Sequence, residues 1–351
     1  MSANDGPANL SIGTVIGRFK ILKKIGEGSC GAVYTCSEIS TKKYAALKAE
    51  LISNYGNGLK LEVQVLKRLS GKKHVAQLLS CGKTDTYCYM VVSLLGVSLY
   101  TFMRSKKFDF SLSTIVRISI QMLFALKQIH QIGIVHRDLK PANMTVGRKG
   151  IEKKIIHIID FGLSRDFTII ENDKLRLRKP REKCLFRGTI KYCSVATMEK
   201  FEQGRNDDLI SLFYICADIH KILPWHYCDK TEEVLKMKKE YSDELLFEFC
   251  PIYSDLIKYA KKLKYHEAPD YGYLSGILKK EMTKNGFKFS DPYEWEEHVD
   301  EFNLKFMPNI EGNGNLPPNS SSNKIITTDT INKFFDKHFS QEAFEKDELG
   351  F

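Results

Sequence analysis

The sequence predicts an α+β fold of two lobes, in which a β-rich lobe with one helix precedes a mainly helical lobe. Two observations support this class: segments with the alternating period of strands dominate residues 18–93, and apolar spacings of three and four dominate residues 94–305. With 43% hydrophobic residues, a chain of 351 residues can bury one large core or two moderate ones. We expect a disordered leader at residues 1–17, one domain at 18–305 and a partly disordered tail at 306–351.

Composition limits the partners and the compartment. The 53 Lys and Arg against 43 Asp and Glu give a net charge of +10, which admits nucleic acid, membrane surfaces or acidic proteins without choosing among them. Nine cysteines without a CxxC pair indicate neither a zinc site nor a disulfide framework, and favour a reducing cytoplasmic compartment, with the nucleus as a second location. The most apolar stretch, Leu209–Leu223, is interrupted by three polar residues and is too short to cross a bilayer. We therefore expect a soluble protein.

The first lobe is predicted to be an antiparallel β-meander. Residues 1–17 show no periodicity, so ordered structure is expected to begin near Arg18. Residues 19–25, 32–35 and 44–48 have the pattern of strands, and Tyr89, Met90, Val91 and Val92 form a further buried strand.

Helices follow. Leu59, Val63 and Leu66 share one helical stripe, with Glu62 at its edge. Longer helices are predicted from apolar residues spaced by three and four between Ile115 and Ile129, and from the apolar run 208–222. Near the end of the chain, 309–323 is too polar to fold alone, and 331–344 has the pattern of a short amphipathic helix.

Three glycines punctuate the turn after the first strand. Gly26, Gly28 and Gly31 lack a Cβ, so the backbone there can approach phosphate groups closely. The same spacing occurs in dinucleotide-binding folds, and Glu50 stands about where such a fold places its ribose partner. That fold requires a helix directly after the glycines, whereas residues 32–35 continue as a strand. An ordinary hairpin turn is the remaining alternative.

Lys48 is the candidate phosphate-binding cation. The period of two places Ala46 and Lys48 on one face of their strand, with a small residue over a base and an ammonium over phosphates. A single strand lysine is usually solvated, but Glu62 on the following helix provides the anion that would hold this ammonium in place.

The loop 136–143 carries the densest set of chemical groups. Asp138 is the candidate that accepts or aligns the proton of an attacking hydroxyl, a role worth roughly 10² to 10⁴ in rate. Lys140 would neutralise charge on a transferred phosphoryl group, and Asn143 would bind a metal ion.

Two neighbours in this loop are predicted to be supports. His136 is expected to pack against Phe161. Arg137 would either pair with a phosphorylated segment or anchor that segment directly. We favour the anchor, because the residues that follow Gly162 carry only two hydroxyl side chains before Thr189.

Asp160 completes the predicted metal site. Residues 154–159 have the pattern of a buried strand that delivers Asp160, whose carboxylate would ligate Mg²⁺ on the phosphates of ATP. The spacing of 17 residues from Asn143 to an Asp-Phe-Gly tripeptide makes a plain turn a poor explanation. Together these residues predict an ATP-dependent protein kinase, and Lys140 with Thr189 favours serine or threonine as the acceptor.

The predicted catalytic residues are Asp138, Lys140 and Lys48. The predicted metal ligands are Asn143 and Asp160. The predicted nucleotide contacts are Ile25, Gly26, Gly28, Gly31, Val33, Ala46, Lys48, Glu62, Val92 and Leu95.

Over residues 18–300 the chain resembles the casein kinase I superfamily, and within it the tau-tubulin kinase branch and its nematode relatives. The motifs that carry this resemblance lie at 59–67, 186–195, 204–209 and 223–225. The resemblance implies the bilobal protein kinase fold, a missing Ala-Pro-Glu motif, activity without phosphorylation of the activation segment, and acidic or already phosphorylated substrates.

The activation segment, which follows Gly162, is strongly basic. Its positive charge favours an acidic substrate. Its cations are Lys174, Arg176, Arg178, Lys179, Arg181, Lys183, Arg187 and Lys191. A solvated charged loop explains the same residues equally well. Ala196, Ile210 and Asp229 depart from residues common in the family, and Val92 is smaller than the usual methionine at the back of the pocket.

Two other functions compete with an active kinase. A pseudokinase scaffold would keep the fold and lose turnover, although no expected motif is missing. A basic module that binds microtubules or nucleic acid would rest on the charge of +10 alone, and no recognition fold accompanies it. We expect a monomer that acts on protein substrates and binds no specific nucleic acid.

Overall fold

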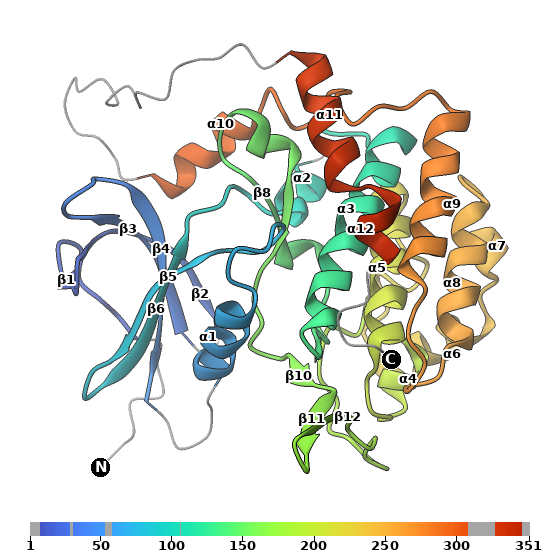
Figure 1. Cartoon of the computed structure of the whole chain (residues 1–351), viewed down its shortest axis with the longest axis horizontal. Helices are drawn as coiled ribbons and strands as arrows, with labels where there is room; N and C mark the ends of the chain where they lie inside the picture. The colour runs from blue at the N-terminus through green and yellow to red at the C-terminus, as the bar shows by residue number, and fades with distance from the viewer. Residues whose placement is uncertain (1–7, 29–30, 53–57, 106, 308–326, 346–351) are drawn as a thin grey trace.

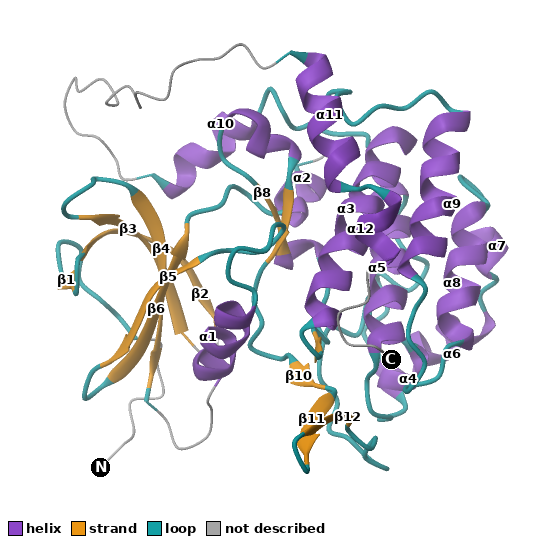
Figure 2. Cartoon of the chain, in the orientation of Figure 1, coloured by secondary structure: helices purple, strands orange, loops and turns teal. Residues whose placement is uncertain are grey.

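The computed structural model describes residues 8–28, 31–52, 58–105, 107–307 and 327–345, and they form two lobes (Figures 1 and 2). The first lobe is a six-stranded antiparallel sheet of order β1-β2-β3-β4-β6-β5, with one helix, α1, packed beside it. Its elements are β1 (Val15–Ile16), β2 (Phe19–Gly28), β3 (Gly31–Glu38), β4 (Tyr44–Leu51), α1 (Gly58–Arg68), β5 (Leu78–Lys83) and β6 (Tyr87–Ser93). The predicted meander and helix are confirmed, whereas β1 and β5 were missed.

The register of the sheet sets which side chains face the second lobe. Val33 lies opposite Lys48, and Ala46 lies opposite Val92, so these four side chains share one face. All four are half-buried, which leaves this face open for contact. The other face forms a separate small core around Leu47.

The second lobe is built from helices packed around α3 and α5 (Figure 2). Its described α-helices up to residue 303 are α2 (Leu99–Arg104), α3 (Leu112–Gln131), α4 (Val195–Met198), α5 (Arg205–His220), α6 (Thr231–Glu240), α7 (Asp243–Leu246), α8 (Ile252–Lys262), α9 (Tyr271–Lys284) and α10 (Val299–Asn303). By length and composition, α3 alone among the described helices could cross a membrane, but 89% of its apolar window is buried inside the fold. The helix α3 is thus the core helix of this lobe.

Short elements between α3 and α4 position the loops that face the first lobe. They are β7 (Ile134–Val135), η1 (Pro141–Asn143), β8 (Met144–Val146), η2 (Gly150–Lys154), β9 (Ile156–Ile158), β10 (Arg165–Asp166), β11 (Thr168–Glu171) and β12 (Lys174–Leu177). The strand predicted at 154–159 is shorter than expected, because Lys154 ends a 3₁₀ helix and donates to backbone carbonyls at Ser290 and Asp291.

The prediction that ordered structure begins near Arg18 is corrected. The Tyr34 hydroxyl donates to the Ala8 carbonyl and accepts from the Leu10 amide, both at 2.9 Å. Ala8 is buried, and β1 pairs with β2. The segment from residue 8 to 17 is therefore part of the first lobe, because a buried tyrosine requires a polar partner for its hydroxyl.

The predicted domain end near residue 305 is also corrected. Two helices, α11 (Thr328–His338) and α12 (Gln341–Glu345), bury Phe335, Phe339 and Phe344 in the core of the second lobe. In Figure 1 this segment lies against α3 and α9. The amphipathic helix predicted at 331–344 exists but is broken in two. The polar loop predicted at 309–323 lies outside the described residues.

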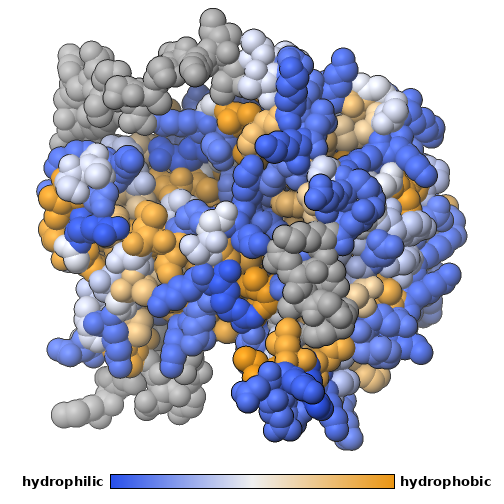
Figure 3. Space-filling model, viewed as in Figure 1, coloured by the Kyte–Doolittle hydropathy of each residue, from blue (hydrophilic) through white to orange (hydrophobic). Residues whose placement is uncertain are grey.

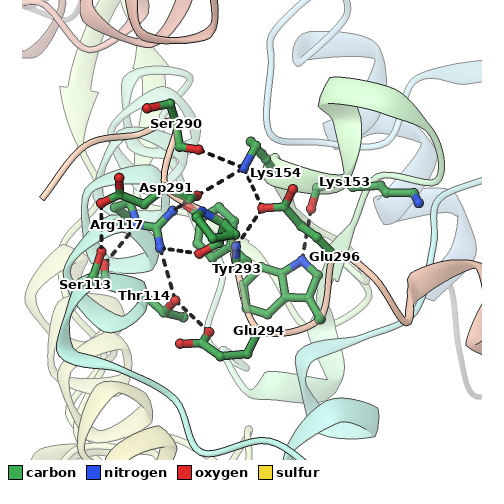
Figure 4. A network of polar contacts seen from close by, with 12 residues as sticks. Ser113, Thr114, Arg117, Lys153, Lys154, Ser290, Asp291, Tyr293, Glu294 and Glu296 are labelled. Atoms are coloured by element: carbon green, nitrogen blue, oxygen red, sulfur yellow. Dashed lines mark hydrogen bonds and ion pairs between the residues drawn. The ribbon is translucent and has the colours of Figure 1, made fainter. Parts of the chain in front are cut away.

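A polar network fixes the chain that leads to α10 (Figure 4). The guanidinium of Arg117 on α3 is fully buried and donates to the carbonyls of Asp291 and Pro292 at 2.6 and 3.1 Å. Lys154 forms an ion pair with Glu296 at 2.5 Å. Because a buried charge is costly unless it is paired or hydrogen-bonded, these contacts hold the segment firmly on α3 and η2.

Beyond α10 the chain crosses to the first lobe. The 3₁₀ helix η3 (Leu304–Phe306) contacts β2. The Thr35 hydroxyl donates to the Phe306 carbonyl at 2.6 Å, and Lys23 donates to the Met307 carbonyl at 3.0 Å. We call residues 304–307 the interlobe strap.

Candidate active site

The candidate site lies between the lobes, where four segments meet. The first lobe contributes Lys48 from β4 and Glu62 from α1. The second contributes the loop 136–143, which follows β7, and Asp160, which follows β9. Residues far apart in the sequence thus meet at one place.

Lys48 makes an ion pair that joins β4 to α1. Its ammonium lies 2.7 Å from the Glu62 carboxylate and 3.6 Å from Asp160. Burial disfavours the charged ammonium, but the carboxylates of Glu62 and Asp160 outweigh it, so the pKa of Lys48 is raised. The predicted Lys48–Glu62 pair is present, and Glu62 also accepts from the Phe161 amide at 3.2 Å.

The remaining predicted nucleotide contacts line the first lobe and the connection to the second. Ile25, Val33, Ala46, Val92 and Leu95 are all half-buried. Of the glycines, Gly31 has a structural requirement of its own, because a Cβ there would lie 2.4 Å from the Ala49 carbonyl oxygen. Among the described residues, a Cβ at Gly28 would meet nothing within 4 Å, and this free space suits the close approach of a phosphate.

Asp138 is the centre of the loop 136–143. Its two carboxylate oxygens accept from the Thr189 hydroxyl and the Lys140 ammonium, each at 2.6 Å. The Asn143 side-chain amide donates to the Asp138 carbonyl at 3.0 Å, which fixes the loop against itself. The carboxylate is therefore held within hydrogen-bond reach of a hydroxyl, as a group that receives a proton from a hydroxyl requires, and the Lys140 cation lies beside it.

Asn143 and Asp160 fit a magnesium ion by their chemistry. Asn143 uses its amide nitrogen within the loop, which leaves its amide oxygen as the ligating atom. The Asp160 side chain is 44% exposed. Burial opposes ionisation of Asp160, but the charge of Lys48 outweighs it and the pKa of Asp160 is lowered. Two oxygen donors, one of them a stable anion, suit Mg²⁺ that takes its other ligands from phosphates and water.

A buried carboxylate from α5 holds the loop in place. Asp208 accepts from the backbone amides of His136 and Arg137 at 2.7 and 2.9 Å, and from the His130 ring at 3.0 Å. Burial opposes its ionisation, but the hydrogen bond from His130 and nearby charge lower the pKa of Asp208. The predicted contact of His136 with Phe161 is confirmed, with ring centroids 5.2 Å apart.

Two residues of the site have left-handed backbone conformations. The φ angles of Arg137 and Asp160 are 70° and 66°, which is uncommon for residues other than glycine. Such strain persists only where surrounding contacts impose it. Here Asp208 and Lys48 provide those contacts, and both strained residues belong to the loops that face the cleft.

Arg137 anchors the chain after Phe161 directly, as predicted. It donates to the carbonyls of Leu163 and Ser164 at 2.7 and 3.3 Å. Burial and the nearby charge of Arg165 lower the pKa of Arg137 to about 10.

Glu202 neutralises the arginines around Arg137. Its carboxylate, 1% exposed, lies 2.5 Å from Arg181 and 3.4 Å from Arg165. Burial opposes ionisation of Glu202, but hydrogen bonds from Arg181 and the charge of both arginines lower its pKa. An internal anion thus occupies the centre of this cationic cluster.

Three supporting residues were not predicted as such. Asp208 lies inside the motif 204–209, and that motif was the signal that could have indicated it. Glu202 and Lys238 carry no local signal, because their partners come from segments distant in sequence.

The basic activation segment is only partly paired. Arg181 and Lys191 form ion pairs with Glu202 and Asp218. The hairpin β11–β12 projects from the molecule, with Ile170 77% exposed, and its Arg176 forms an exposed ion pair with Glu171 at 3.5 Å. Figure 3 shows hydrophobic surface beside hydrophilic side chains around this hairpin. Both solvated and paired cations therefore occur in this segment.

Comparison with known proteins gives consistent results. Residues 19–271 match the family model described as "Protein kinase domain". A Caenorhabditis elegans protein named "Putative serine/threonine-protein kinase" is 44% identical over 301 residues, covering 84% of this chain and 87% of that protein. A Dictyostelium discoideum protein named "Probable serine/threonine-protein kinase" is 34% identical over 284 residues, covering 80% of this chain and 57% of that protein.

Proposed function

We propose, on the premise that this chain belongs to the protein kinase family and is a serine/threonine-protein kinase, that it acts with magnesium-ATP and without phosphorylation of its own activation segment. The expected bilobal fold and the use of ATP follow from the family. The magnesium, the independence from phosphorylation and the substrate class are the parts that we propose.

The chemistry rests on the groups around Asp138. A substrate serine or threonine hydroxyl takes the place of Thr189 near Asp138 and gives up its proton to the carboxylate. Its oxygen bonds to the γ-phosphorus of ATP as the bond to the β,γ-bridging oxygen breaks, and ADP leaves. Lys140 neutralises the transferred group, and Lys48, fixed by Glu62, holds the phosphates.

Magnesium would be held by Asn143 and Asp160. When bound, it would supply positive charge that offsets the negative charge of the phosphates. The lowered pKa of Asp160 keeps that carboxylate ionised at neutral pH, so the ligand is available throughout the physiological range.

The observation that carries phosphorylation independence is the position of Glu202. Kinases that need a phosphate on this segment use it to pair with arginines near the loop. In this chain the Glu202 carboxylate already pairs with Arg165 and Arg181, and Arg137 is already bonded to Leu163 and Ser164. The Lys48–Glu62 ion pair is formed as well. These contacts need no added phosphate.

An acidic substrate is supported by the charge of the activation segment. Lys174 and Arg176 lie on the exposed strand β12, where they can meet a carboxylate or phosphate on a protein. The motifs at 186–195 and 223–225 further support a place in the casein kinase I superfamily, near the tau-tubulin kinases. We propose a monomer that works in the cytoplasm and the nucleus.

The decisive experiment is phosphate transfer by the full chain to a serine/threonine peptide library that contains acidic, phosphorylated and neutral peptides. Wild type is expected to prefer acidic peptides, before and after phosphatase treatment. Asp138→Asn is expected to lose about 10² to 10⁴ in kcat and to retain nucleotide binding. A wild type as inactive as Asp138→Asn on every peptide would refute the enzyme. Activity lost on phosphatase treatment would refute only the independence from phosphorylation.

A further inference from the structure

Lys238 is a buried lysine whose ammonium bonds to the backbone of the activation segment. It lies on α6 and is 3% exposed. Its Nζ donates to the carbonyls of Ile190 and Cys193, both at 2.6 Å. Lysine is rarely this buried without an anionic partner. Among the described residues no carboxylate forms a salt bridge with Lys238, so two peptide carbonyls are its polar partners.

Aromatic rings complete the surroundings of this ammonium. The Nζ atom lies 5.1 Å from the ring centroid of Tyr214 and 5.4 Å from that of Trp225, within the range of cation–π attraction. Burial lowers the pKa of Lys238 to about 8, so the ammonium remains the main form at neutral pH. The indole of Trp225 also donates to the Lys191 carbonyl at 2.8 Å.

The segment held in this way is the one next to the catalytic aspartate. Thr189, its first residue, donates to Asp138 at 2.6 Å. Of the residues that follow, Ile190 and Cys193 accept from Lys238 through their carbonyls, and the Lys191 carbonyl accepts from Trp225. Tyr192 itself donates from its hydroxyl to Asp218 at 2.7 Å. Residues 189–193 are thus held in place by side chains of the second lobe. A substrate whose hydroxyl reaches Asp138 must pass beside these residues.

We propose that Lys238 is a positioning residue for protein substrates: its ammonium holds residues 189–193 in the conformation that receives the substrate chain beside Asp138. The proposal rests on the proposed function and adds a residue that touches neither ATP nor the reacting hydroxyl. A cation bonded to backbone carbonyls ties this segment to α6.

The test compares Lys238→Met with Lys239→Met in the full chain. Methionine keeps most of the volume of Lys238 but removes the donors, leaving two buried carbonyls without partners. Lys239 is the matched control, because its side chain is 48% exposed and, among the residues that the structure describes, pairs with Glu199. We expect Lys238→Met to raise KM for a peptide substrate about tenfold or more, with nucleotide affinity within about twofold of wild type. Lys239→Met should change neither value.

Amide hydrogen exchange provides a readout that does not depend on catalysis. Lys238→Met should speed exchange in residues 189–193 and leave α5 and β4 unchanged. If exchange there is unchanged, Lys238 does not position the segment, whether or not wild type phosphorylates any peptide. If peptide KM and nucleotide affinity worsen in the same proportion, or exchange rises throughout the molecule, the lysine supports the fold in general and the proposal fails. Suppose that wild type is inactive, and that Lys238→Met speeds exchange in residues 189–193 alone. That outcome would refute the kinase activity and leave the role of Lys238 in positioning this segment intact.

Discussion

The ionisation of the Glu202 carboxylate depends on a balance between burial, which opposes it, and the positive charge of neighbouring arginines, which favours it. The carboxylate is removed from water, yet the arginines at 165 and 181 keep it ionised. Hydrogen bonds to charged groups contribute about 1.5–3 kcal/mol each, more than neutral ones. The geometry of the cationic cluster around Arg137 therefore depends on one anion.

We predict that Glu202→Gln lowers the free energy of unfolding by about 1.5–3 kcal/mol and lowers kcat, because the arginine cluster loses its anion. Denaturant unfolding and steady-state kinetics measure the two effects. Glu199→Gln is the control, since Glu199 pairs with the half-exposed Lys239 and should change stability by less than about 1 kcal/mol. Equal kcat values for Glu202→Gln and wild type would contradict a role for this anion in activity.

At the scale of elements, α11 belongs to the core of the second lobe. The Phe335 ring is fully buried and stacks on Phe289, with centroids 5.1 Å apart. Phe339 packs on Phe124 of α3, at 5.5 Å. Burial of the Phe335, Phe339 and Phe344 side chains explains why a segment beyond the expected domain end is part of the fold.

We predict that Phe335→Ala destabilises the protein by about 3–5 kcal/mol, because it removes a ring from a packed site and leaves a cavity. Lys337→Ala on the same helix, an exposed position, should change stability by less than about 0.5 kcal/mol. Chemical denaturation of the full chain measures both. A loss below 1 kcal/mol for Phe335→Ala would mean that α11 contributes little to the core.

The interlobe strap is the second element that extends the fold beyond 305. Thr35 lies on the face of β3 that carries Val33, above the nucleotide contacts, and is fully buried beneath the Phe306 carbonyl. One hydrogen bond of the strap therefore lies on the same sheet face as the predicted nucleotide contacts, and it ties the first lobe to the second.

We predict that Thr35→Val weakens ATP binding roughly two- to tenfold, because a lost hydrogen bond of about 0.5–1.5 kcal/mol loosens the lobes that must close on the nucleotide. Titration with ATP measures the affinity. Thr41→Val removes a hydroxyl that bonds to Glu38 at an exposed turn and should leave affinity unchanged. Equal ATP affinities for Thr35→Val and Thr41→Val would contradict a role of the strap in nucleotide binding.

At the scale of the whole molecule, three histidines join distant segments. The Nε2 atoms of His74, before β5, and His338, on α11, are 3.0 Å apart, and the centroid of His157 on β9 is 6.3 Å from that of His74. Burial lowers all three pKa values, to about 4 for His157 and His338. Lys73 lowers the pKa values of His74 and His338 further, and Glu152 lies 3.9 Å from His157.

We predict that stability falls as pH drops from about 6.5 toward 4. In that window the unfolded histidines, with ordinary pKa values near 6.5, bind protons that the folded ones do not, so acid favours unfolding. Above pH 6.5 the contribution to stability is complete. Melting temperatures across pH 4.5–7.5 measure the slope, which His338→Phe should make shallower. His266→Phe, at an exposed position, is the control, and equal slopes for the two variants would contradict the prediction.

The sequence by itself determined the two-lobed fold and the main strands and helices, and it predicted the residues that we propose for the catalytic, metal and nucleotide sites. These groups were predictable because short-range spacing carries them: period two in β4, periods of three and four in α3, and fixed separations from Asp138 to Asn143 and from Asn143 to Asp160. The loop 136–143 contains three of the predicted catalytic and metal-binding residues within eight positions.

Only the tertiary structure decided what holds those groups in place. Glu202, Lys238 and Asp208 act on segments 21 to 72 residues away, and the strap joins Thr35 to Phe306 across 271 residues. A lysine that bonds to carbonyls or a carboxylate among arginines has no local pattern, because its role depends on burial and on partners that meet only after folding. Burial likewise decided that α11 belongs to the core.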